Sequence, residues 1–472
     1  MAKKATLLSV YQLLPQTNCA KCGEITCMSF ASKLLERRAT VEECPPLRED
    51  QYGSQAVKLR DLVAPPIKEI VLGVGERAVK LGGKQVVYRH ELTLHNPTAI
   101  AIDVSDKVDD STLASRCKLI ESFQFTRIGE KLTLNAIALR YASGNPERFA
   151  QAAALVTRST SLPLVLCSLD PEGLRHAVEQ KGVLNKRPLL YAATKDNWKE
   201  VGSLAKQYKC PIAVFAPNDL RTLKSLVRTL QTIGVEDIVL DPGFYPEGGK
   251  MKDSIEHLVM IRRAAIQRED KDFAYPILLI PAVAWLGDGV DERAAAYREA
   301  YLASLLLTRF ADMIILHSTE TWEILPVITL RQSVYTDPRK PVAVESGLRE
   351  IGKPDVNSPV LITSNFALTY YTVSNDIESQ GVTCYLLVLN TEGLSVETSV
   401  AGGQFTAADV KDLIASTGIE GKIGHRKLII PGLAARLSGD IEDQTKWEVI
   451  VGPRDSSEIK GFLEKRWEVR KA

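Results

Sequence analysis

Four of the eight cysteines in this chain of 472 residues lie close together near its start. They are Cys19, Cys22, Cys27 and Cys44, with the spacing C-x2-C-x4-C-x16-C-P, so one tight loop supplies three thiols and a later segment the fourth. Zinc ribbons usually present two similar C-x2-C knuckles, whereas three close cysteines and a distant Cys-Pro favour a 4Fe-4S cluster. Zinc and free structural thiols remain the alternatives.

A helix is expected between the third and fourth cysteines. The run MSFASKLLERRA, residues 28–39, places apolar side chains at helical spacing and charged side chains between them. Such a helix would bring Cys44 back beside the loop. The other cysteines have no motif around them, and three lie in or beside apolar runs, so we expect buried, inert thiols: these are Cys117, Cys167, Cys210 and Cys384.

Composition narrows the class of protein. With 59 basic and 58 acidic residues, the chain has almost no net charge, which argues against nucleic acid and anionic membranes as partners. The first residues lack a signal peptide's apolar run, and no window holds eighteen consecutive apolar residues. We therefore expect a cytoplasmic protein. In a reducing cytosol, clustered cysteines hold metal more often than they form disulfides.

The middle of the chain repeats one pattern eight times: a short apolar run, a polar loop and a helical stretch. Continuous apolarity is typical of strands covered on both faces, and eight βα units predict a closed (β/α)8 barrel. A hairpin turning at Leu81–Lys84 is expected just before it. The predicted barrel strands are residues 99–105, 135–141, 162–168, 188–194, 211–217, 237–243, 275–285 and 312–318.

Polar residues fall at the carboxyl ends of these strands, where barrel enzymes place their chemistry. They form no evident metal triad or acid–base pair, and single acids at strand ends are usually loop or helix-capping residues. We interpret this barrel as a scaffold. The residues concerned are Asp103, Arg140, Thr194, Asn218, Asp241 and His317.

A new α/β pattern begins after a polar linker around residues 345–359. Five strands are expected within about 115 residues, including a short one in LSVETSV (394–400), which is the size of a small doubly wound, flavodoxin-like domain. Ligands of such sheets bind outside the carboxyl strand ends, so the loops TSNFALT, NTEGLSV, PGLAA and GPRDSSE predict one pocket. Small and hydroxylic residues there suit a large flat ligand with amide edges, or merely form turns and caps.

These patterns divide the chain into three parts. We expect a cluster domain in residues 1–60, a barrel with its hairpin in 61–350 and an α/β domain in 351–472. The polar, Pro-ended stretch of residues 48–66 is expected to act as a connector that lets the first domain move. The fold class is therefore α/β, with a small N-terminal metal domain.

The whole chain resembles the large (gamma) subunit of the corrinoid iron–sulfur protein of acetyl-CoA decarbonylase/synthase systems. The most specific matching segments are PQTNCAKCGEITCMSFA near the start, and SPVLITSNFALTYYTV and NTEGLSV near the end. The resemblance implies a 4Fe-4S cluster on the four cysteines and a cobamide on the last domain. By motif, it implies corrinoid contacts from Thr363, Thr369, Gly393, Leu394, Ser395, Val396 and Ser456.

The sequence lacks the Asp-x-His-x-x-Gly pattern by which another class of corrinoid domains supplies a histidine to cobalt. His425, in KIGHRKLI, lies in a different context, just before a predicted strand. We therefore expect a base-off cobamide without a protein histidine ligand. Loss of a strong axial donor makes the cob(I)amide state easier to reach, since axial ligation is a lever on a macrocyclic metal's potential.

The resemblance implies relay of a methyl group, as the methyltransferase component of a cytoplasmic complex. The donor would be a methyl-tetrahydropterin, tetrahydrosarcinapterin or tetrahydrofolate, and the acceptor the nickel site of acetyl-CoA synthase, with reversed steps during methanogenesis from acetate. The cluster would reduce inactive cob(II)amide to cob(I)amide. Implied partners are a small (delta) subunit, the acetyl-CoA synthase subunit and CO dehydrogenase. Two alternatives remain: a pterin-binding barrel methyltransferase and a cobalt-free electron-transfer scaffold.

Overall fold

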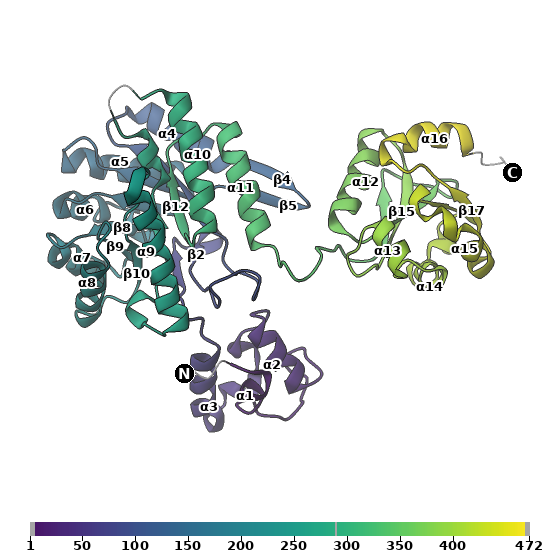
Figure 1. Cartoon of the computed structure of the whole chain (residues 1–472), viewed down its shortest axis with the longest axis horizontal. Helices are drawn as coiled ribbons and strands as arrows, with labels where there is room; N and C mark the ends of the chain where they lie inside the picture. The colour runs from purple at the N-terminus through teal and green to yellow at the C-terminus, as the bar shows by residue number, and fades with distance from the viewer. Residues whose placement is uncertain (1–4, 288–289, 468–472) are drawn as a thin grey trace. The chain divides into compact units, whose positions relative to one another are not determined.

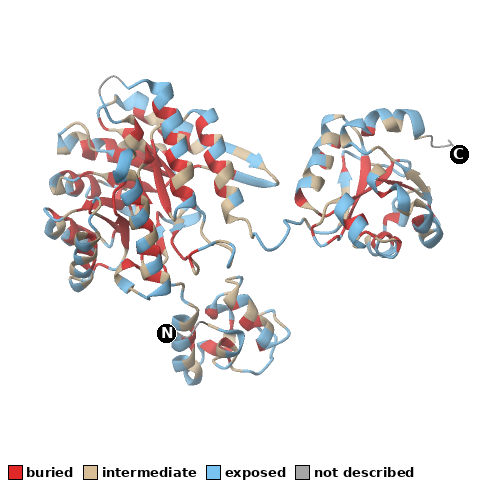
Figure 2. Ribbon diagram, viewed as in Figure 1, coloured by how far each residue is buried: buried red, intermediate tan, exposed pale blue. Residues whose placement is uncertain are grey.

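The computed structural model describes residues 5–287 and 290–467, and the chain divides into two compact units. The first unit comprises Met1–Gln124 and Thr133–Tyr335, and the second comprises Phe125–Leu132 and Thr336–Ala472. In each unit, the buried residues concentrate on the strands of a central sheet (Figure 2). None of the described helices is long and apolar enough to cross a membrane.

A small helical region opens the first unit (Figure 1). Its helix α2 (Cys27–Leu35) confirms the predicted helix over residues 28–35, and the chain then leaves the helix because Arg37 has φ +55°. Phe30 and Leu34 pack on one face of α2 in a core that also holds Cys27 and Cys44. The other elements here are α1 (Leu7–Tyr11), η1 (Val41–Glu43), η2 (Pro45–Arg48), η3 (Asp50–Tyr52) and α3 (Gly53–Val63).

The prediction that residues 48–66 form a connector that lets the first domain move is wrong for most of this length. Helix α3 occupies its centre, because Ala56 and Leu59 recur at helical spacing and pack into the N-terminal core. Lys68 already donates its backbone N–H to the carbonyl of Ala274 in the barrel. Residues 64–66 are therefore the short covalent link between the two parts, and Arg37 of the N-terminal region also pairs with Glu69 and donates to the carbonyl of Gly83.

The hairpin before the barrel exists, but its predicted turn is misplaced. Strands β1 (Ile70–Leu72) and β2 (Val79–Leu81) pair antiparallel, and the chain reverses between them through η4 (Gly75–Arg77). Leu81 therefore ends the second strand instead of starting the turn. Gly73 and Gly75, both at positive φ, allow the earlier reversal.

Eight parallel strands form the barrel, and each lies within one of the predicted runs. The sheet order is β10-β9-β8-β7-β6-β3-β12-β11, and a parallel bridge from Leu240 to Ile277 brings its two edges together. β11 is only two residues long, since Pro281 starts a 3-10 turn, η7 (Pro281–Trp285). The strands are β3 (Ala99–Ser105), β6 (Ala136–Arg140), β7 (Leu164–Cys167), β8 (Leu189–Ala193), β9 (Ile212–Phe215), β10 (Ile238–Asp241), β11 (Leu278–Leu279) and β12 (Met313–Leu316).

Helices cover the outside of this barrel (Figure 1). Several begin at a side chain that accepts first-turn N–H groups, as Asp109, Asn145, Asp170 and Asp219 do. A two-stranded sheet that the sequence patterns did not predict, β4 (Gln124–Arg127) with β5 (Glu130–Thr133), interrupts the alternation. The helices are α4 (Asp110–Ser122), α5 (Pro146–Ser159), α6 (Pro171–Val178), α7 (Trp198–Tyr208), α8 (Leu220–Thr232), α9 (Gly248–Gln267), α10 (Glu292–Thr308) and α11 (Thr321–Tyr335).

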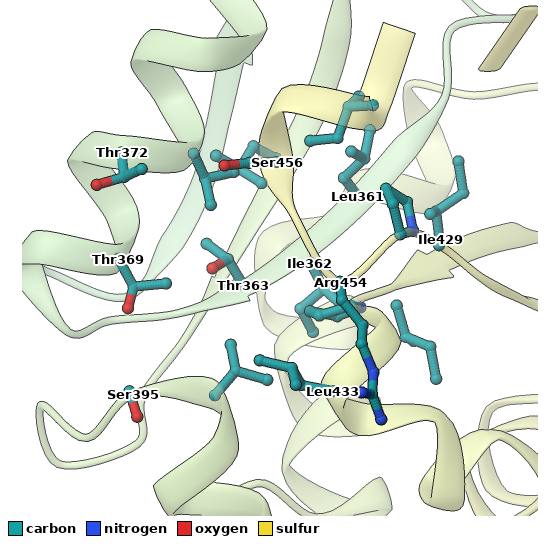
Figure 3. A pocket seen from close by; sticks show the side chains of 18 of the residues that line it. Leu361, Ile362, Thr363, Thr369, Thr372, Ser395, Ile429, Leu433, Arg454 and Ser456 are labelled. Atoms are coloured by element: carbon teal, nitrogen blue, oxygen red, sulfur yellow. The ribbon is translucent and has the colours of Figure 1, made fainter. Parts of the chain in front are cut away.

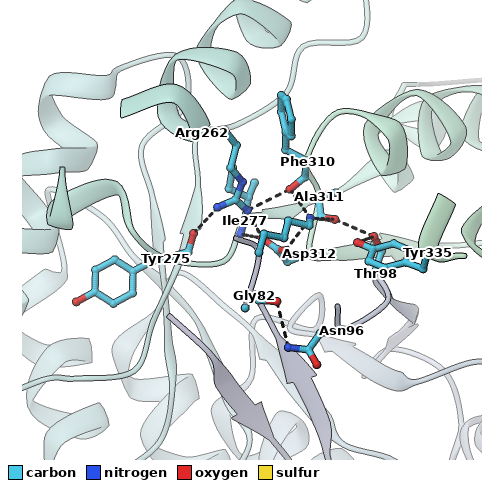
Figure 4. Close-up of polar contacts among 12 residues, drawn as sticks. Gly82, Asn96, Thr98, Arg262, Tyr275, Ile277, Phe310, Ala311, Asp312 and Tyr335 are labelled. Atoms are coloured by element: carbon cyan, nitrogen blue, oxygen red, sulfur yellow. Dashed lines mark hydrogen bonds and ion pairs between the residues drawn. The ribbon is translucent and has the colours of Figure 1, made fainter. Parts of the chain in front are cut away.

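A buried ion network lies at the amino-terminal end of β12 (Figure 4). Asp312 is fully buried and pairs with Lys84, at 2.8 Å, and with the buried Arg262. Burial would raise the pKa of Asp312, but the charges of Arg262 and Lys84 hold it below its ordinary value. Arg262 also donates to the carbonyl of Tyr275, at 3.0 Å. Through Arg262 and Lys84, the network links α9 and the segment after β2 to the start of β12.

The second unit is a five-stranded α/β sheet in the order β13-β15-β14-β16-β17. β14, β15, β16 and β17 run parallel, and β13 pairs antiparallel with β15 at the edge. The four parallel strands lie within four of the five predicted strands, which were residues 359–364, 383–390, 426–432 and 447–453. The strands are β13 (Gly347–Ile351), β14 (Val360–Ser364), β15 (Cys384–Leu389), β16 (Lys427–Ile430) and β17 (Glu448–Val451).

Two predictions about this sheet are wrong. The segment LSVETSV is not a strand, because Ser395 caps helix α13 (Val396–Gly402) and accepts the N–H of Thr398. The fifth strand is instead β13, from the supposed linker, whose backbone hydrogen bonds are satisfied at the edge of β15. Helices cover both faces: α12 (Ala367–Ser379), α14 (Ala407–Thr417), α15 (Ser438–Thr445) and α16 (Ile459–Arg466), with η8 (Ile419–Gly421), η9 (Gly432–Leu437) and η10 (Ser456–Glu458).

Candidate functional site

A pocket of about 410 Å³ opens at the carboxyl ends of the parallel strands in the second unit (Figure 3). Its walls come from β14, α12, the start of α13 and the segments that follow β16 and β17. The deep wall is apolar, while hydroxyl groups and one guanidinium lie nearer the loops. The polar lining residues are Thr363, Thr369, Thr372, Ser395, Glu397, Arg454 and Ser456.

Five of the seven residues suggested by the resemblance line this pocket. They are Thr363, Thr369, Ser395, Val396 and Ser456. The loops were therefore correctly expected to meet around one cavity.

The other two, Gly393 and Leu394, lie in the turn before α13 and are not among the lining residues. Gly393 has φ +77°, and a Cβ there would lie 2.9 Å from the side chain of Pro341. Only glycine therefore fits this turn. These two residues shape the loop that presents Ser395.

Two buried hydroxyls beside the pocket have no hydrogen-bond partner among the described residues. Thr363 is 2% exposed and its Oγ1 faces no acceptor or donor, and Ser364 is fully buried with an equally unpartnered Oγ. Thr363 lines the cavity, whereas Ser364 does not. A buried hydroxyl left unpaired costs about 1–3 kcal/mol, so Thr363 is poised to bond a ligand.

Asn365 ties the two main loops together, and sequence reasoning missed it. Its Oδ1 accepts the backbone N–H groups of Thr391, at 2.9 Å, and Gly393, at 3.0 Å. Its Nδ2 donates to the carbonyl of Val344 and to Oδ1 of Asn390. The signal was present in TSNFALT, since a buried amide after a strand often crosslinks neighbouring loops.

His425 does not line the pocket. Its Nε2 is 3.0 Å from the carbonyl oxygen of Ser358, and its Nδ1 accepts the N–H of Lys427 at 3.2 Å. Its ring also packs edge-on against Trp467. Both ring nitrogens are thus engaged with the backbone, and the histidine holds the start of β16.

The four N-terminal cysteines share one neighbourhood. The side chain of Asn18 accepts the N–H of Cys27 at 2.8 Å, which fixes the loop against the start of α2. Cys27 and Cys44 are buried, Cys22 is half-buried and Cys19 is exposed. Burial raises the pKa of Cys44, and the negative charge of the other three thiolates raises it further.

The thiols are near one another without forming a ready coordination shell. Within residues 5–287 and 290–467, no three His, Cys, Asp or Glu side chains are grouped as a bound ion would group them. The donor set itself, four thiols on a loop, a helix start and a Cys-Pro turn, suits an iron–sulfur cluster or zinc.

The remaining cysteines are buried or half-buried, as expected. Burial raises the pKa of Cys117 and Cys210 to about 11 and that of Cys384 to about 12. Burial also raises the pKa of Cys167, which lines a cavity in the barrel. Thiols with raised pKa values are poor nucleophiles and poor ligands.

A second cavity, of about 480 Å³, lies at the carboxyl end of the barrel strands. Folding brings Asp103 and His317 into hydrogen-bond contact there, and Arg140 Nε donates to Asp103 Oδ2 at 2.9 Å. The sequence showed no acid–base pair, because β3 and β12 are far apart in the chain and adjacent only in the barrel. Burial would raise the pKa of Asp103, but His317 and Arg140 hold it below its ordinary value.

The end of β12 that carries His317 is itself fixed by a buried acid. Glu299 of α10 accepts the backbone N–H groups of His317, at 2.7 Å, and Ser318, at 3.1 Å. Burial and the neighbouring Glu299 raise the pKa of Glu323 to about 9. Glu323 therefore keeps its proton at neutral pH.

The other three strand-end residues make internal bonds. Tyr191 donates its hydroxyl to Asp241 Oδ2 at 2.8 Å, and burial raises the pKa of Asp241 to about 7. Thr194 donates its N–H to Asn197, and Asn218 accepts a hydrogen bond from Ser254. Thr194 and Asn218 thus hold the loops that follow their strands.

Comparison with known proteins identifies the relatives of this chain. A family model described as "CO dehydrogenase/acetyl-CoA synthase delta subunit" matches residues 69–463, and one described as "Putative Fe-S cluster" matches residues 14–46. The acetyl-CoA decarbonylase/synthase complex subunit gamma of Methanothermobacter thermautotrophicus is 50% identical over 98% of this chain and 99% of its own length. The gamma subunit of Archaeoglobus fulgidus is also 50% identical, over 98% of both chains.

Among solved structures, dihydropteroate synthase from Xanthomonas albilineans covers 57% of this chain and 100% of its own, with 15% identity and a TM-score of 0.38. The family model that covers the barrel and the α/β domain is described as delta, whereas the full-length relatives, which also match the N-terminal segment, are gamma subunits. The chain belongs to the family of acetyl-CoA decarbonylase/synthase complex gamma subunits.

Proposed function

We propose that this chain is a corrinoid iron–sulfur subunit that carries a methyl group on cobamide cobalt. The methyl would pass between a methyl-tetrahydropterin and the nickel site of acetyl-CoA synthase. The observation that carries the proposal is the pocket at the strand ends of the second unit, with the unpartnered buried hydroxyl of Thr363 in its wall. Family membership supports it.

The pocket residues fit part of a cobamide. A cavity of about 410 Å³ cannot hold a whole cobamide, so the flat corrin ring would lie over the opening while the nucleotide tail enters. The hydroxyls of Thr363, Thr369 and Ser395 would bond ring amides or the tail. We propose base-off binding without a protein histidine, since the lining residues include no histidine and His425 is engaged elsewhere.

The N-terminal thiols fit an iron–sulfur cluster. We propose that Cys19, Cys22, Cys27 and Cys44 hold one 4Fe-4S cluster, which their shared neighbourhood supports. When bound, the cobamide would supply a metal centre that accepts and releases a methyl group, and the cluster would supply single electrons. The chain's own contribution would be to bind both groups, the cobamide at the pocket and the cluster at the four cysteines.

Exposed apolar side chains at the pocket support a partner over the corrin's other face. Leu368 is 51% exposed and Leu433 is 37% exposed, and both line the opening. We propose that a small (delta) subunit covers this apolar edge. Acetyl-CoA synthase and CO dehydrogenase subunits would bind at the same edge in its place. Soluble methyl-tetrahydropterin would be the small-molecule substrate of this methyltransferase component, in the cytoplasm.

A second candidate function is favoured by the barrel cavity. Its apolar walls, the Asp103–His317 pair and the buried, unpartnered Nε1 of Trp285 would suit a flat heterocycle with donors and acceptors on one edge. The barrel itself would then bind the methyl-tetrahydropterin. Asp103→Asn should weaken binding of that compound about tenfold while leaving cobamide binding unchanged, as measured by equilibrium dialysis.

Metal analysis of the anoxically purified full chain, supplied with a cobamide, tests the main proposal. We expect about four irons and one cobalt per chain, with little zinc. Iron without cobalt would contradict the corrinoid function and favour an electron-transfer scaffold. Zinc in place of iron would contradict the assignment of a 4Fe-4S cluster.

Single substitutions sharpen this test. Cys22→Ser should abolish the cluster's electron paramagnetic resonance signal and lower the iron content, because serine is a poor ligand for iron–sulfur clusters. Cys210→Ser is the matched control, since this buried thiol lies outside the cysteine cluster. Equal iron loss in both variants would contradict the assignment.

A further inference from the structure

Arg454 is a charged residue in the wall of the pocket, and its side chain has no partner among the described residues. Its side chain lies along the cavity beside Leu433 (Figure 3). It makes no hydrogen bond or ion pair with any residue that the structure describes. The other charged lining residue, Glu397, is likewise unpaired within the described residues, so the guanidinium is not neutralised from within the pocket.

The stem of Arg454 is held by close backbone packing. A Cβ on Gly432 would lie 3.0 Å from Arg454 Cγ and 2.9 Å from the carbonyl oxygen of Gly452. Gly432 also donates its N–H to the carbonyl of Pro453 at 2.9 Å. Two segments, after β16 and after β17, thus meet without side chains between them and fix the point from which the guanidinium extends.

The pocket changes in character from its floor to its opening. Leu361, Ile362, Leu386 and Ile429 are buried and apolar, whereas Arg454 is exposed at the opening. An apolar ring would therefore enter the depth, and an anionic group attached to it would come to rest near the guanidinium. Arginine binds phosphate oxygens through two parallel N–H groups.

Resting on the proposed function, we propose that Arg454 binds the phosphate of the cobamide's nucleotide loop and selects complete cobamides over corrinoids that lack this group. The loop joins the corrin ring to the base through one phosphodiester, which is its only permanent charge. With the base in the apolar depth and the ring over the opening, the phosphate lies between them, at the level of Arg454. Glu397 is then left exposed to solvent.

Two probes that differ only by this phosphate test the inference: cobinamide, which lacks the nucleotide loop, and cobinamide phosphate. The full chain, purified anoxically, should bind cobinamide phosphate about 5- to 20-fold more tightly in equilibrium dialysis. Arg454→Gln should abolish this preference and leave the affinity for cobinamide unchanged. The preference should also weaken as salt is raised, because the guanidinium is exposed.

Matched variants separate charge from structure. Arg454→Lys should keep part of the preference, since lysine binds phosphate as a point charge. Arg466→Gln removes an equal charge from α16, away from the pocket lining. This variant should keep the full preference for cobinamide phosphate. A preference that survives in Arg454→Gln, or that is lost equally in Arg466→Gln, would overturn the inference. Failure of the unaltered chain to bind either probe would instead overturn the proposed function on which the inference rests.

Discussion

Two cavities occupy the same topological position, the carboxyl ends of parallel strands, in different units of this chain. In the barrel, Asp103 pairs with His317 and Arg140, and Tyr191 donates to Asp241. In the five-stranded sheet, by contrast, Thr363 Oγ1 has no partner among the described residues. The two cavities therefore share a position in their sheets, and they differ in whether their polar groups find hydrogen-bond partners within the protein.

This contrast indicates which of the two cavities requires a ligand. The main polar groups at the barrel mouth bond one another, so that cavity can persist without a guest, with the Nε1 of Trp285 as an exception. The pocket of the second unit keeps a buried hydroxyl unsatisfied beside an apolar floor, which costs stability until something binds. Four substitutions, with their controls, test how buried polar groups contribute in the two units.

The largest effect is expected from Asp312→Asn in the barrel. It leaves the buried cations Lys84 and Arg262 without their carboxylate and should lower the free energy of unfolding by about 3–5 kcal/mol. Because the folded pKa of Asp312 is lowered, its contribution is present above the ordinary value of 3.8 and is lost as pH falls through the folded pKa. Urea unfolding measures both effects.

Glu247→Gln is the control for this substitution. It removes an exposed ion pair with Arg298 from the same unit and should change stability by less than about 1 kcal/mol. Equal losses of unfolding free energy in the two variants would show that burial of the ion pair does not determine the cost of removing its carboxylate.

Asp241→Asn should stabilise the protein at high pH. Folded Asp241 holds its proton to about pH 7, whereas the unfolded side chain ionises near 3.8, so stability falls as pH rises between these values. Asparagine carries no such penalty: its Oδ1 can still accept the N–H of Gly243, and its Nδ2 can donate to the oxygen of the Tyr191 hydroxyl. We expect a gain of about 2–4 kcal/mol at pH 8 that disappears below pH ~4. A gain that is independent of pH would refute the protonation argument.

Thr363→Val should separate stability from ligand binding. Removal of an unpartnered buried hydroxyl should raise the stability of the ligand-free chain by about 1 kcal/mol, and should weaken cobamide binding about tenfold. Ser364→Ala is the matched control, because its hydroxyl is also unpartnered but lies outside the pocket lining. Thermal unfolding and equilibrium dialysis give the two readouts, and equal affinity loss in both variants would contradict the assignment.

The smallest effect is expected from Asp103→Asn. The partners of Asp103 are partly exposed, His317 at 34% and Arg140 at 51%, so solvent screens their pairing and the loss should be about 1 kcal/mol at pH 7. The folded pKa of Asp103 is below its ordinary value of 3.8, so the difference from the unaltered chain should shrink as pH falls through the folded pKa. Urea unfolding at pH 3 and pH 7 checks this, and a constant difference would argue against the ion pair.

Local sequence signals predicted the loops around the pocket but not every residue that matters in them. The family resemblance suggested Thr363, Ser395 and Ser456, and the loops that hold them were predicted independently because parallel strands deliver their following loops to one edge. Asn365 and Arg454 were missed, because an amide's crosslinks and a guanidinium's lack of partners depend on residues distant in sequence.

The cysteine spacing, the eight βα units and the four parallel strands of the second sheet can all be predicted from the amino-acid sequence alone, since the spacing is read directly and the strands follow from apolar periodicity. The adjacency of the strands is instead a property of the folded chain, and it places Asp103 beside His317 and pairs the supposed linker, as β13, with β15. The tertiary structure also determines which polar groups find partners. Hydrogen bonding between segments far apart in the chain depends on their placement in space, which no local pattern encodes.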